Sequence, residues 1–345
     1  MVEVIDLRSD TVTLPTKAMR EAMYRAEVGD DGFGEDPTVN RLQEMAAQRM
    51  GKDEALFVAS GTMADLVSML THCGRGEGVI MGDQSHTFTS EQGGSAALGG
   101  LFLRMVPNQP DGTLDLAQVE AAIPSEDIHH PRVRLLNLEN THNFCGGMVL
   151  RPEYMAAAAA SAHKHGLAVH LDGARLFNAA VALGVPAREL AQHADSVMFC
   201  LSKGLCCPVG SLMCGSTEFI ERARRTRKVL GGGMRQAGVL AAAGIVALQQ
   251  MVDRLQEDHD NARLLAEGIA TTPGLHVDLA RVQTNIVFFE LHRTGLTAPQ
   301  FAEALQQEGI RLMAFNDVRM RAVTHHGIAR ADIERTLSVT RQTLS

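Results

Sequence analysis

One lysine stands at the end of an apolar run and could act as a nucleophile. The run covers residues 196–201, and Lys203 follows it, with Gly204 directly after. The apolar pattern predicts a buried central strand, so we expect Lys203 where that strand leaves the sheet. Ligands of open α/β sheets bind at this edge, and a partly desolvated ammonium has a lowered pKa that suits Schiff-base chemistry. A surface lysine in a turn between two strands is the alternative.

Two further features could serve the same chemistry. Residues 167–171 predict a second strand, which ends on Asp172. The turn at residues 60–62 precedes an amphipathic helical pattern, and the free N–H groups of a helix N-terminus form an anion site. A phosphate site, a carboxylate and a strand-end lysine are what pyridoxal phosphate requires, because the carboxylate pairs with the pyridinium nitrogen. Each feature is weak alone, but their order along the chain favours this cofactor.

Motifs for other cofactors and catalytic sites are absent from the sequence. It contains no Gly-x-x-x-x-Gly-Lys-Ser/Thr, no Gly-x-Gly-x-x-Gly after the first predicted strand, and no Gly-x-Ser-x-Gly. His163 and His165 fall on a predicted helix, where residues two apart do not face each other. We therefore expect no metal site.

Composition sets limits on the class of protein. The 345 residues are 45% hydrophobic and 21% charged, as in a soluble globular protein of about two domains. A net charge of −8 argues against nucleic acid or an anionic membrane as a partner. No apolar run approaches the ~20 residues of a membrane span, and the N-terminus does not resemble a secretory signal. The six cysteines show no CxxC spacing and read as free thiols, so we expect a cytoplasmic protein.

Predicted strands and helices alternate through most of the chain. Short apolar runs separated by helical patterns occur at residues 55–59, 78–81, 133–138, 167–171 and 196–200. This alternation predicts an α/β fold with a mostly parallel central sheet and helices on both faces. A long helical pattern over residues 236–270, broken by Gly238 and Gly244, precedes an α+β pattern. We therefore predict a large domain, with an N-terminal arm, over residues 1–249 and a small domain over residues 250–345.

Nearly the whole chain resembles the L-threonine aldolases, which are pyridoxal phosphate enzymes of fold type I with an aspartate-aminotransferase-like fold. The motifs that carry the resemblance are DLRSDTVT at 6–13, VGDD at 28–31, EDPT at 35–38, SGTM at 60–63, LENTHN at 138–143, DGARLFNA at 172–179, LSKG at 201–204, GGGMRQAG at 231–238 and VTH at 323–325. The resemblance implies a retro-aldol reaction, in which L-threonine, L-allo-threonine or another β-hydroxy-α-amino acid yields glycine and an aldehyde. It also implies a homotetramer with sites shared between subunits.

The resemblance assigns cofactor-binding roles to matching positions. Lys203 would hold pyridoxal phosphate as a Schiff base, and Asp172 would pair with the ring nitrogen. Gly61 and Thr62 would hold the phosphate. His86, in a loop after a predicted strand, would stack on the ring.

Further positions would bind the substrate or reach another subunit. Ser9, Arg175 and Arg321 would receive the substrate carboxylate, since an arginine fork matches this planar group, and Arg175 would also lie near the cofactor. Lys228 and Arg235 would reach the phosphate of a neighbouring subunit.

Several choices stay open at this point. His86 and His129 are both candidates for the base that takes the β-hydroxyl proton, directly or through water, since a histidine pKa of about 6.5 suits that task. Arg319 shares a predicted strand with Arg321, so the register of that strand decides between them. His142 is interpreted as a structural residue that caps a turn.

Alternative reactions also stay open. Transamination or β-elimination would use the same lysine and aspartate, and a non-catalytic protein on the same fold is the alternative of another class. Two cysteines at residues 206–207 depart from the small residues usual in the family. The preference among threonine, allo-threonine and aryl-serine is therefore open.

Overall fold

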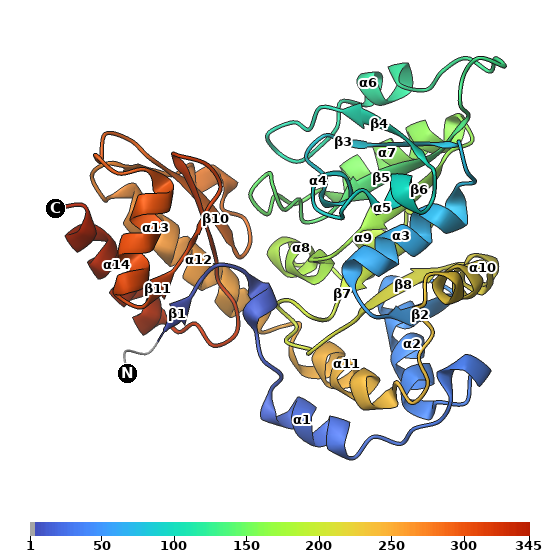
Figure 1. Ribbon diagram of the computed structural model, residues 1–345, viewed down its shortest axis with the longest axis horizontal. Helices are drawn as coiled ribbons and strands as arrows, with labels where there is room; N and C mark the ends of the chain where they lie inside the picture. The colour runs from blue at the N-terminus through green and yellow to red at the C-terminus, as the bar shows by residue number, and fades with distance from the viewer. Residues whose placement is uncertain (1–3) are drawn as a thin grey trace.

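The computed structural model describes residues 4–345, and its larger part is built around a seven-stranded sheet (Figure 1). The strand order is β2, β8, β7, β6, β5, β3, β4. Strand β8 runs antiparallel to both neighbours, and the other pairs are parallel. The strands are β2 (Glu54–Val58), β3 (Gly78–Gly82), β4 (Phe102–Val106), β5 (Val133–Glu139), β6 (Ala168–Asp172), β7 (Ser196–Cys200) and β8 (Ser211–Gly215). The predicted α/β fold with a mostly parallel sheet is confirmed.

Helices cover both faces of this sheet, and alternate side chains of the central strands point into the two resulting cores. In β7, Val197 and Phe199 enter one core, whereas Met198 and Cys200 enter the other. Every residue of β7 is buried, as expected for a strand covered on both faces. The first core contains residues of α2 (Pro37–Met50), α7 (Pro152–Lys164), α8 (Leu176–Leu183), α9 (Ala187–Ala191) and α11 (Gly238–Gln250), and the second contains residues of α3 (Gly61–His72) and α10 (Thr217–Val229).

The C-terminal part has its own sheet and core. Its four-stranded antiparallel sheet contains β12 (Met313–Ala314), β13 (Arg319–Val323), β10 (Ile286–Leu291) and β9 (Leu275–His276). The core includes residues of α12 (Leu255–Ala270), α13 (Ala298–Gln307) and α14 (Arg330–Thr343).

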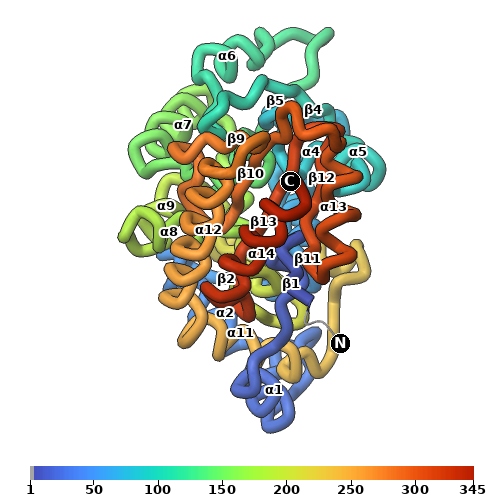
Figure 2. Tube along the Cα trace, turned by 90° about the vertical axis from the view of Figure 1, so that its left-hand side faces the viewer, coloured from blue at the N-terminus to red at the C-terminus, as the bar shows by residue number. Residues whose placement is uncertain are grey.

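The start of the described chain also belongs to this C-terminal part. Strand β1 (Ile5–Asp6) pairs in parallel with β11 (Ile310–Arg311), and Figures 1 and 2 show the blue strand beside the red end of the chain. Ile5 and Leu7 are buried in the C-terminal core. The chain then crosses to the larger part through η1 (Asp10–Val12), so residues near position 10 lie at the junction of the two parts.

The long helical pattern over residues 236–270 forms two helices. Helices α11 and α12 are separated at residues 251–254 and bent by 70°. The expectation that Gly244 breaks the helix is wrong, because this residue lies inside α11. A Cβ there would lie 2.8 Å from Leu42, so glycine allows α11 to pack closely on α2. The predicted domain boundary at residue 249/250 coincides with the end of α11 and stays a prediction.

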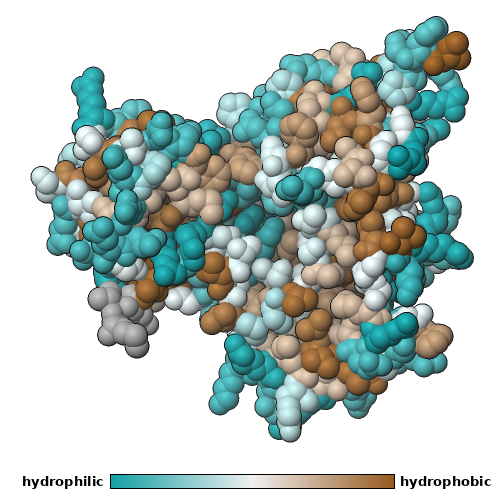
Figure 3. Space-filling model, viewed as in Figure 1, coloured by the Kyte–Doolittle hydropathy of each residue, from teal (hydrophilic) through white to brown (hydrophobic). Residues whose placement is uncertain are grey.

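Shorter elements complete the described chain. They are α1 (Lys17–Tyr24), η2 (Asp31–Phe33), α4 (His86–Thr89), α5 (Gly94–Ala97), α6 (Leu116–Ala121) and η3 (Leu279–Arg281). Within residues 4–345, no single helix has both the length and the apolar composition of a membrane span, and only the bent pair α11–α12 meets those criteria together. On the face shown in Figure 3, most of the strongly hydrophobic residues lie on the larger part.

Candidate active site

The two residues expected to hold the cofactor follow neighbouring strands of the sheet. Strands β6 and β7 are adjacent and parallel; β6 ends on Asp172, and Lys203 comes three residues after the end of β7. Asp172 is only 2% exposed, and its Oδ1 accepts a hydrogen bond from the backbone N–H of Ala174 at 3.0 Å. The Lys203 carbonyl accepts from the Thr13 hydroxyl at 2.8 Å, which ties the lysine loop to the crossing N-terminal segment. Both residues therefore lie at the carboxyl edge of the sheet, where ligands of such folds bind.

The predicted phosphate turn is the N-terminus of α3. Ser60 caps this helix by accepting from the backbone N–H of Met63 at 3.2 Å, and Gly61 and Thr62 begin its first turn. A Cβ at Gly61 would lie 2.8 Å from Sγ of Cys200, so glycine lets the helix start approach the end of β7. Among residues 4–345, no acceptor is recorded for the N–H groups of Gly61 and Thr62, which leaves them for an anion.

Around Asp172 lies a cluster of buried carboxylates, which we call the carboxylate cluster: Asp65, Glu91, Glu139 and Asp172. Burial, followed by the negative charge of Glu139, raises the pKa of Asp172 to about 7. Burial and the charge of Asp172 raise the pKa of Asp65 well above its ordinary value. Lys203, and His86 when its ring is protonated, are the cations that oppose these charges on Asp172. The cluster therefore holds more carboxylates than its own cations balance.

The carboxylate cluster also positions His86. The backbone N–H of His86 donates to Glu139 Oε2 at 2.7 Å, and its ring Nδ1 lies 3.0 Å from Glu91 Oε1. The hydrogen bond to Glu91 is the main reason that the pKa of His86 is raised, against the opposite effect of burial. The ring is thus fixed through Nδ1, and no partner is recorded for Nε2 in the described residues.

A line of hydrogen bonds extends from Asp65 to His72. His170 Nε2 lies 3.2 Å from Asp65 Oδ1, His170 Nδ1 lies 2.8 Å from the Ser196 hydroxyl, and that hydroxyl lies 2.7 Å from His72 Nε2. Burial lowers the pKa of His170 to about 3 and that of His72 to about 4, so both rings are neutral near pH 7. Neutral imidazoles cannot compensate the charge of the carboxylate cluster.

Two predicted substrate-binding arginines lie in a second cluster, which we call the arginine cluster: Asp10, Asn143, Arg175 and Arg321. Arg175 donates from Nε and Nη2 to both carboxylate oxygens of Asp10 at 2.7 Å. Asn143 Oδ1 accepts from Arg175 at 3.4 Å and from Arg321 at 3.1 Å. The register of β13 places Arg321 opposite Phe288, and the side chain points to the junction near Asp10.

The carboxylate of the arginine cluster is compensated within it, whereas one of its two guanidinium groups, that of Arg321, is not. Burial raises the pKa of Asp10, but Arg175 outweighs that effect and holds the pKa well below its ordinary value. Burial and the positive charge of Arg175 lower the pKa of Arg321 to about 10, so Arg321 stays charged near neutral pH. Its Nε is buried and has no hydrogen-bond partner among residues 4–345. An unpartnered buried donor on a charged group is a candidate to receive an anion.

The structure does not bring every predicted residue into these clusters. His129 is 79% exposed, lies in the long loop between α6 and β5 that extends from the larger part in Figure 1, and contacts Asp127 at 2.5 Å. Lys228 and Arg235 line a separate hollow of about 620 Å³. Arg235 pairs with Asp30 at 3.3 Å. Ser9 caps η1 by accepting from the backbone N–H of Thr11 at 3.2 Å.

Sequence reasoning missed most carboxylates of the site. Asp10 and Glu139 were present only as letters of family motifs, and Asp65 and Glu91 were not singled out. Glu139 carried a signal, since it is the last residue of a strand that lies beside β6. Asp65 and Glu91 carried none, because their approach to Asp172 depends on how α3 and the loop after α4 pack. His142 is buried, with Nδ1 accepting from the backbone N–H of Cys145 at 3.3 Å, which agrees with a turn-capping role.

Comparisons with known proteins place the chain in a family. Residues 6–292 match the beta-eliminating lyase family. Low-specificity L-threonine aldolase 1 of Arabidopsis thaliana is 50% identical over 344 residues, which cover 99% of this chain and 96% of the relative. This chain belongs to the beta-eliminating lyase family. A second relative, the low specificity L-threonine aldolase of Escherichia coli (strain K12), is 47% identical over 330 residues, which cover 96% of each chain. The resemblance to the L-threonine aldolases is confirmed.

Solved structures show the same fold. The threonine aldolase of Leishmania major has a TM-score of 0.85 at 19% identity, covering 99% of this chain and 100% of that one. A structure of SPT with PLP internal aldimine has a TM-score of 0.77 at 21% identity, covering 99% of this chain and 87% of that one. These solved structures share the fold in which Asp172 and Lys203 of this chain follow neighbouring strands.

Proposed function

We propose that this chain is a pyridoxal-phosphate-dependent aldolase that cleaves L-threonine, L-allo-threonine and other β-hydroxy-α-amino acids to glycine and an aldehyde. The observation that carries the proposal is the placement of Lys203 and buried Asp172 at neighbouring strand ends, within a carboxylate cluster that lacks enough cations. Relatives 47–50% identical along nearly the whole chain are named L-threonine aldolases, which supports the same reaction here.

The described residues fit pyridoxal phosphate in charge and in hydrogen bonding. A protonated ring nitrogen at Asp172 would offset the carboxylate cluster, whose members raise one another's pKa values. The N–H groups of Gly61 and Thr62 would receive the phosphate at the start of α3. Lys203 would supply the amine that holds the aldehyde, and His86 would lie along the ring. When bound, the cofactor supplies an electron sink for the electron pair of the broken Cα–Cβ bond.

Arg321 is the main receiver of the substrate carboxylate in this proposal. Both Nε and Nη2 of Arg175 are already used by Asp10, whereas Nε of Arg321 is buried and unpartnered within residues 4–345. Arg175 then acts by holding Asn143, which orients Arg321. The Ser9 hydroxyl accepts hydrogen bonds from Thr11, so its own proton is free to be donated to the substrate carboxylate.

His86 is the base that this site supports best. With Nδ1–H donating to Glu91, the lone pair on Nε2 can accept the proton of the substrate's β-hydroxyl group. Glu91 stabilises the cationic ring that results, as the raised pKa of His86 reflects. His129, an exposed loop residue, would need a neighbouring subunit to reach a reacting group, and its role stays a proposal.

β-Elimination is the second candidate reaction, because the matching family is described as beta-eliminating lyases. It would eliminate the β-hydroxyl group of threonine as water, and hydrolysis of the resulting enamine, through its imine tautomer, would take up one water and give a keto acid and ammonia, with no aldehyde. The two reactions share Lys203 and Asp172, so the site residues alone do not separate them.

The products from purified protein loaded with pyridoxal phosphate test the proposal. Equimolar acetaldehyde and glycine from L-threonine and L-allo-threonine would establish the aldol cleavage, and the ratio of the two rates would give the stereochemical preference. A keto acid without aldehyde would instead support elimination. The Lys203→Ala protein is the control for cleavage that does not depend on the site.

The assembly and location of the protein are also proposals. Leu14, Tyr24, Phe33 and Val229 are large apolar residues on the surface of the larger part and its N-terminal arm. Their exposure supports a homotetramer in which Lys228 and Arg235 complete a neighbouring site. We propose a cytoplasmic enzyme of two domains, divided near residues 249/250, which takes a small amino acid as substrate. The net charge of −8 does not favour nucleic-acid or membrane partners.

A further inference from the structure

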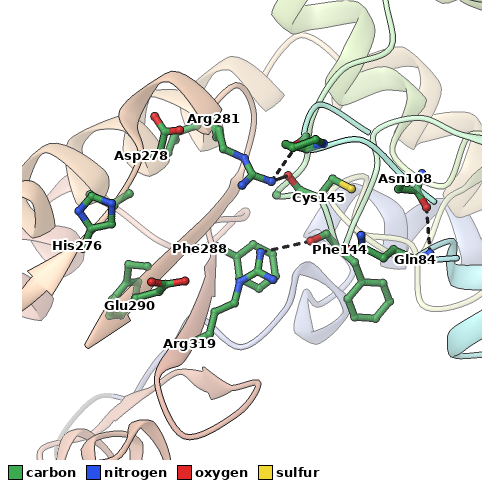
Figure 4. Close-up of a pocket in the computed structure, with 15 residues that line it drawn as sticks. Gln84, Asn108, Phe144, Cys145, His276, Asp278, Arg281, Phe288, Glu290 and Arg319 are labelled. Atoms are coloured by element: carbon green, nitrogen blue, oxygen red, sulfur yellow. Dashed lines mark hydrogen bonds between the residues drawn. The ribbon is translucent and has the colours of Figure 1, made fainter. Parts of the chain in front are cut away.

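A second polar pocket lies between the larger and the C-terminal parts, outside both clusters described above. It has a volume of about 470 Å³. Its larger-part wall includes residues 144–146, and its C-terminal wall includes residues of β9, β10, η3 and β13 (Figure 4). A volume of this size can hold a small organic molecule.

Two guanidinium groups face the larger part across this pocket. Nη2 of Arg281 donates to the carbonyl oxygens of Pro110 and Cys145 at 2.9 and 3.0 Å. Nη2 of Arg319 lies 3.4 Å from the carbonyl oxygen of Phe144. The Arg319 guanidinium also lies 4.0 Å from the ring centroid of Phe288. Both cations are thus held in place by neutral groups, and neither forms an ion pair with a carboxylate in residues 4–345.

Among residues 4–345, the acids that line the same pocket form no ion pair with these arginines. Asp278 accepts from the backbone N–H of Ala280 at 3.0 Å, and Glu290 lies 3.1 Å from His292 Nε2. Figure 4 shows Asp278, Glu290 and His276 on one side, whereas the guanidinium groups reach toward residues 144–145. Burial and then the positive charge of Arg281 lower the pKa of Arg319, and the negative charge of Glu290 opposes this shift without reversing it.

This pocket is separated from Arg321 by aromatic rings. Arg321 lies 5.1 Å from the ring centroid of Phe315, and Phe315 makes edge contacts with Phe288 and Phe144 at centroid distances of 5.1 and 5.7 Å. Arg319 lies on the far side, over Phe288. The two arginines of β13 therefore serve different spaces.

We propose that Arg281 and Arg319 form a binding site for a small carboxylate between the two parts of the chain. The carboxylate would accept from both guanidinium groups, whose planar forks match it, and its carbon skeleton would lie against Phe288 and Phe144. Since Arg281 already joins the C-terminal part to two carbonyls of the larger part, an anion here would strengthen that junction. The site does not depend on the proposed aldolase reaction.

Equilibrium dialysis of radiolabelled succinate against the full-length protein loaded with pyridoxal phosphate tests the site. Arg319→Gln should weaken succinate binding at least tenfold, and Arg281→Lys, which keeps the charge but loses the fork, should weaken it less. Arg321→Gln should keep this binding, because it alters only the proposed substrate site. Arg330→Gln is the matched control, since Arg330 is an exposed arginine of α14 that pairs with Glu334. Circular dichroism melts would confirm that each variant folds.

Three outcomes would overturn the proposal. Equal succinate affinity in the wild-type and Arg319→Gln proteins would remove Arg319 from any anion site. Loss of binding in Arg321→Gln alone would mean that succinate occupies only the proposed substrate site. Tighter binding of inorganic phosphate than of succinate, lost in Arg319→Gln, would reassign the pocket to phosphate groups. None of these results depends on whether threonine is cleaved.

Discussion

The carboxylate cluster and the arginine cluster both feel the charge of Lys203, and they handle buried charge in opposite ways. In the arginine cluster, Asp10 has both oxygens on Arg175, so its pKa falls well below the ordinary value. In the carboxylate cluster, Asp172 has no cationic hydrogen-bond partner within residues 4–345, and its pKa rises to about 7. The protein alone compensates the carboxylate of the arginine cluster, whereas it leaves the carboxylates of the other cluster undercompensated.

The difference indicates which parts of the site the chain builds and which it leaves to a ligand. A buried ion pair with both partners present is stable as it stands, whereas buried unpaired carboxylates must be protonated or compensated. The carboxylate cluster therefore suits a cationic ring nitrogen. The arginine cluster offers one unused buried donor, Nε of Arg321, which suits an anionic substrate group.

The largest expected effect comes from Lys203, whose charge opposes both Asp172 and Asp10. Lys203→Ala should abolish the visible absorbance band of the lysine-bound cofactor and all measurable cleavage of L-threonine. Absorbance spectra of the reconstituted protein check this directly. Retention of the band would remove Lys203 from its proposed role.

Asp10→Asn should show that the arginine cluster depends on its own carboxylate. Removing one partner of a buried pair costs about 3–5 kcal/mol, so urea unfolding at pH 7 should show a loss of that order. Because the folded pKa of Asp10 is depressed, its contribution is present above the unfolded pKa of about 3.8 and is lost as the pH falls through the folded pKa. The difference between the two proteins should therefore shrink below pH 4. A constant difference down to the lowest pH at which both fold would contradict the depressed pKa.

Arg321→Ala should mainly weaken amino-acid binding. Charged hydrogen bonds contribute about 1.5–3 kcal/mol, which corresponds to a KM for L-threonine raised roughly 10- to 150-fold. Steady-state kinetics measure this change, and Arg319→Ala on the same strand is the control. Unchanged kinetics for Arg321→Ala would remove it from the substrate site.

A further expected effect is one of pH on the stability of the cofactor-free protein. The pKa of Asp172 is raised on folding, so its protonated form favours the folded state at low pH, and stability falls as the pH rises from about 4 to about 7. Asp172→Asn should remove this loss and make the cofactor-free protein more stable than wild type at pH 8, by roughly 1–4 kcal/mol. Thermal melts at pH 5 and pH 8 compare the two proteins. A lower stability of Asp172→Asn at pH 8 would show that the carboxylate is already compensated.

The sequence predicts only some residues of the carboxylate cluster and its surroundings. Apolar runs and their terminal residues identify Asp172 and Lys203, because strand ends of a parallel sheet meet at one edge. Asp65 and Glu91 come from a helix and from a loop after α4, and their approach to Asp172 depends on packing that no local pattern encodes.

The contacts of the arginine cluster could be predicted from the sequence even less well than those of the carboxylate cluster. The family resemblance supplied Arg175 and Arg321, but not the pairing of Arg175 with Asp10, which are 165 positions apart. That pairing arises because the N-terminal segment leaves the C-terminal core and crosses to the larger part. Gly244 likewise does not mark the break between α11 and α12; it lies inside α11, where tertiary packing against Leu42 requires a small residue.

The central claim is that the carboxylate cluster is completed by a protonated ring nitrogen. Nuclear magnetic resonance of the protein loaded with pyridoxal phosphate labelled with ¹⁵N in the ring tests this most directly. The account predicts that the ring nitrogen stays protonated from pH 6 to pH 9 in the wild-type protein. In the Asp172→Asn protein, the ring nitrogen should lose its proton within that range. An unprotonated nitrogen in the wild-type protein at neutral pH would contradict the account.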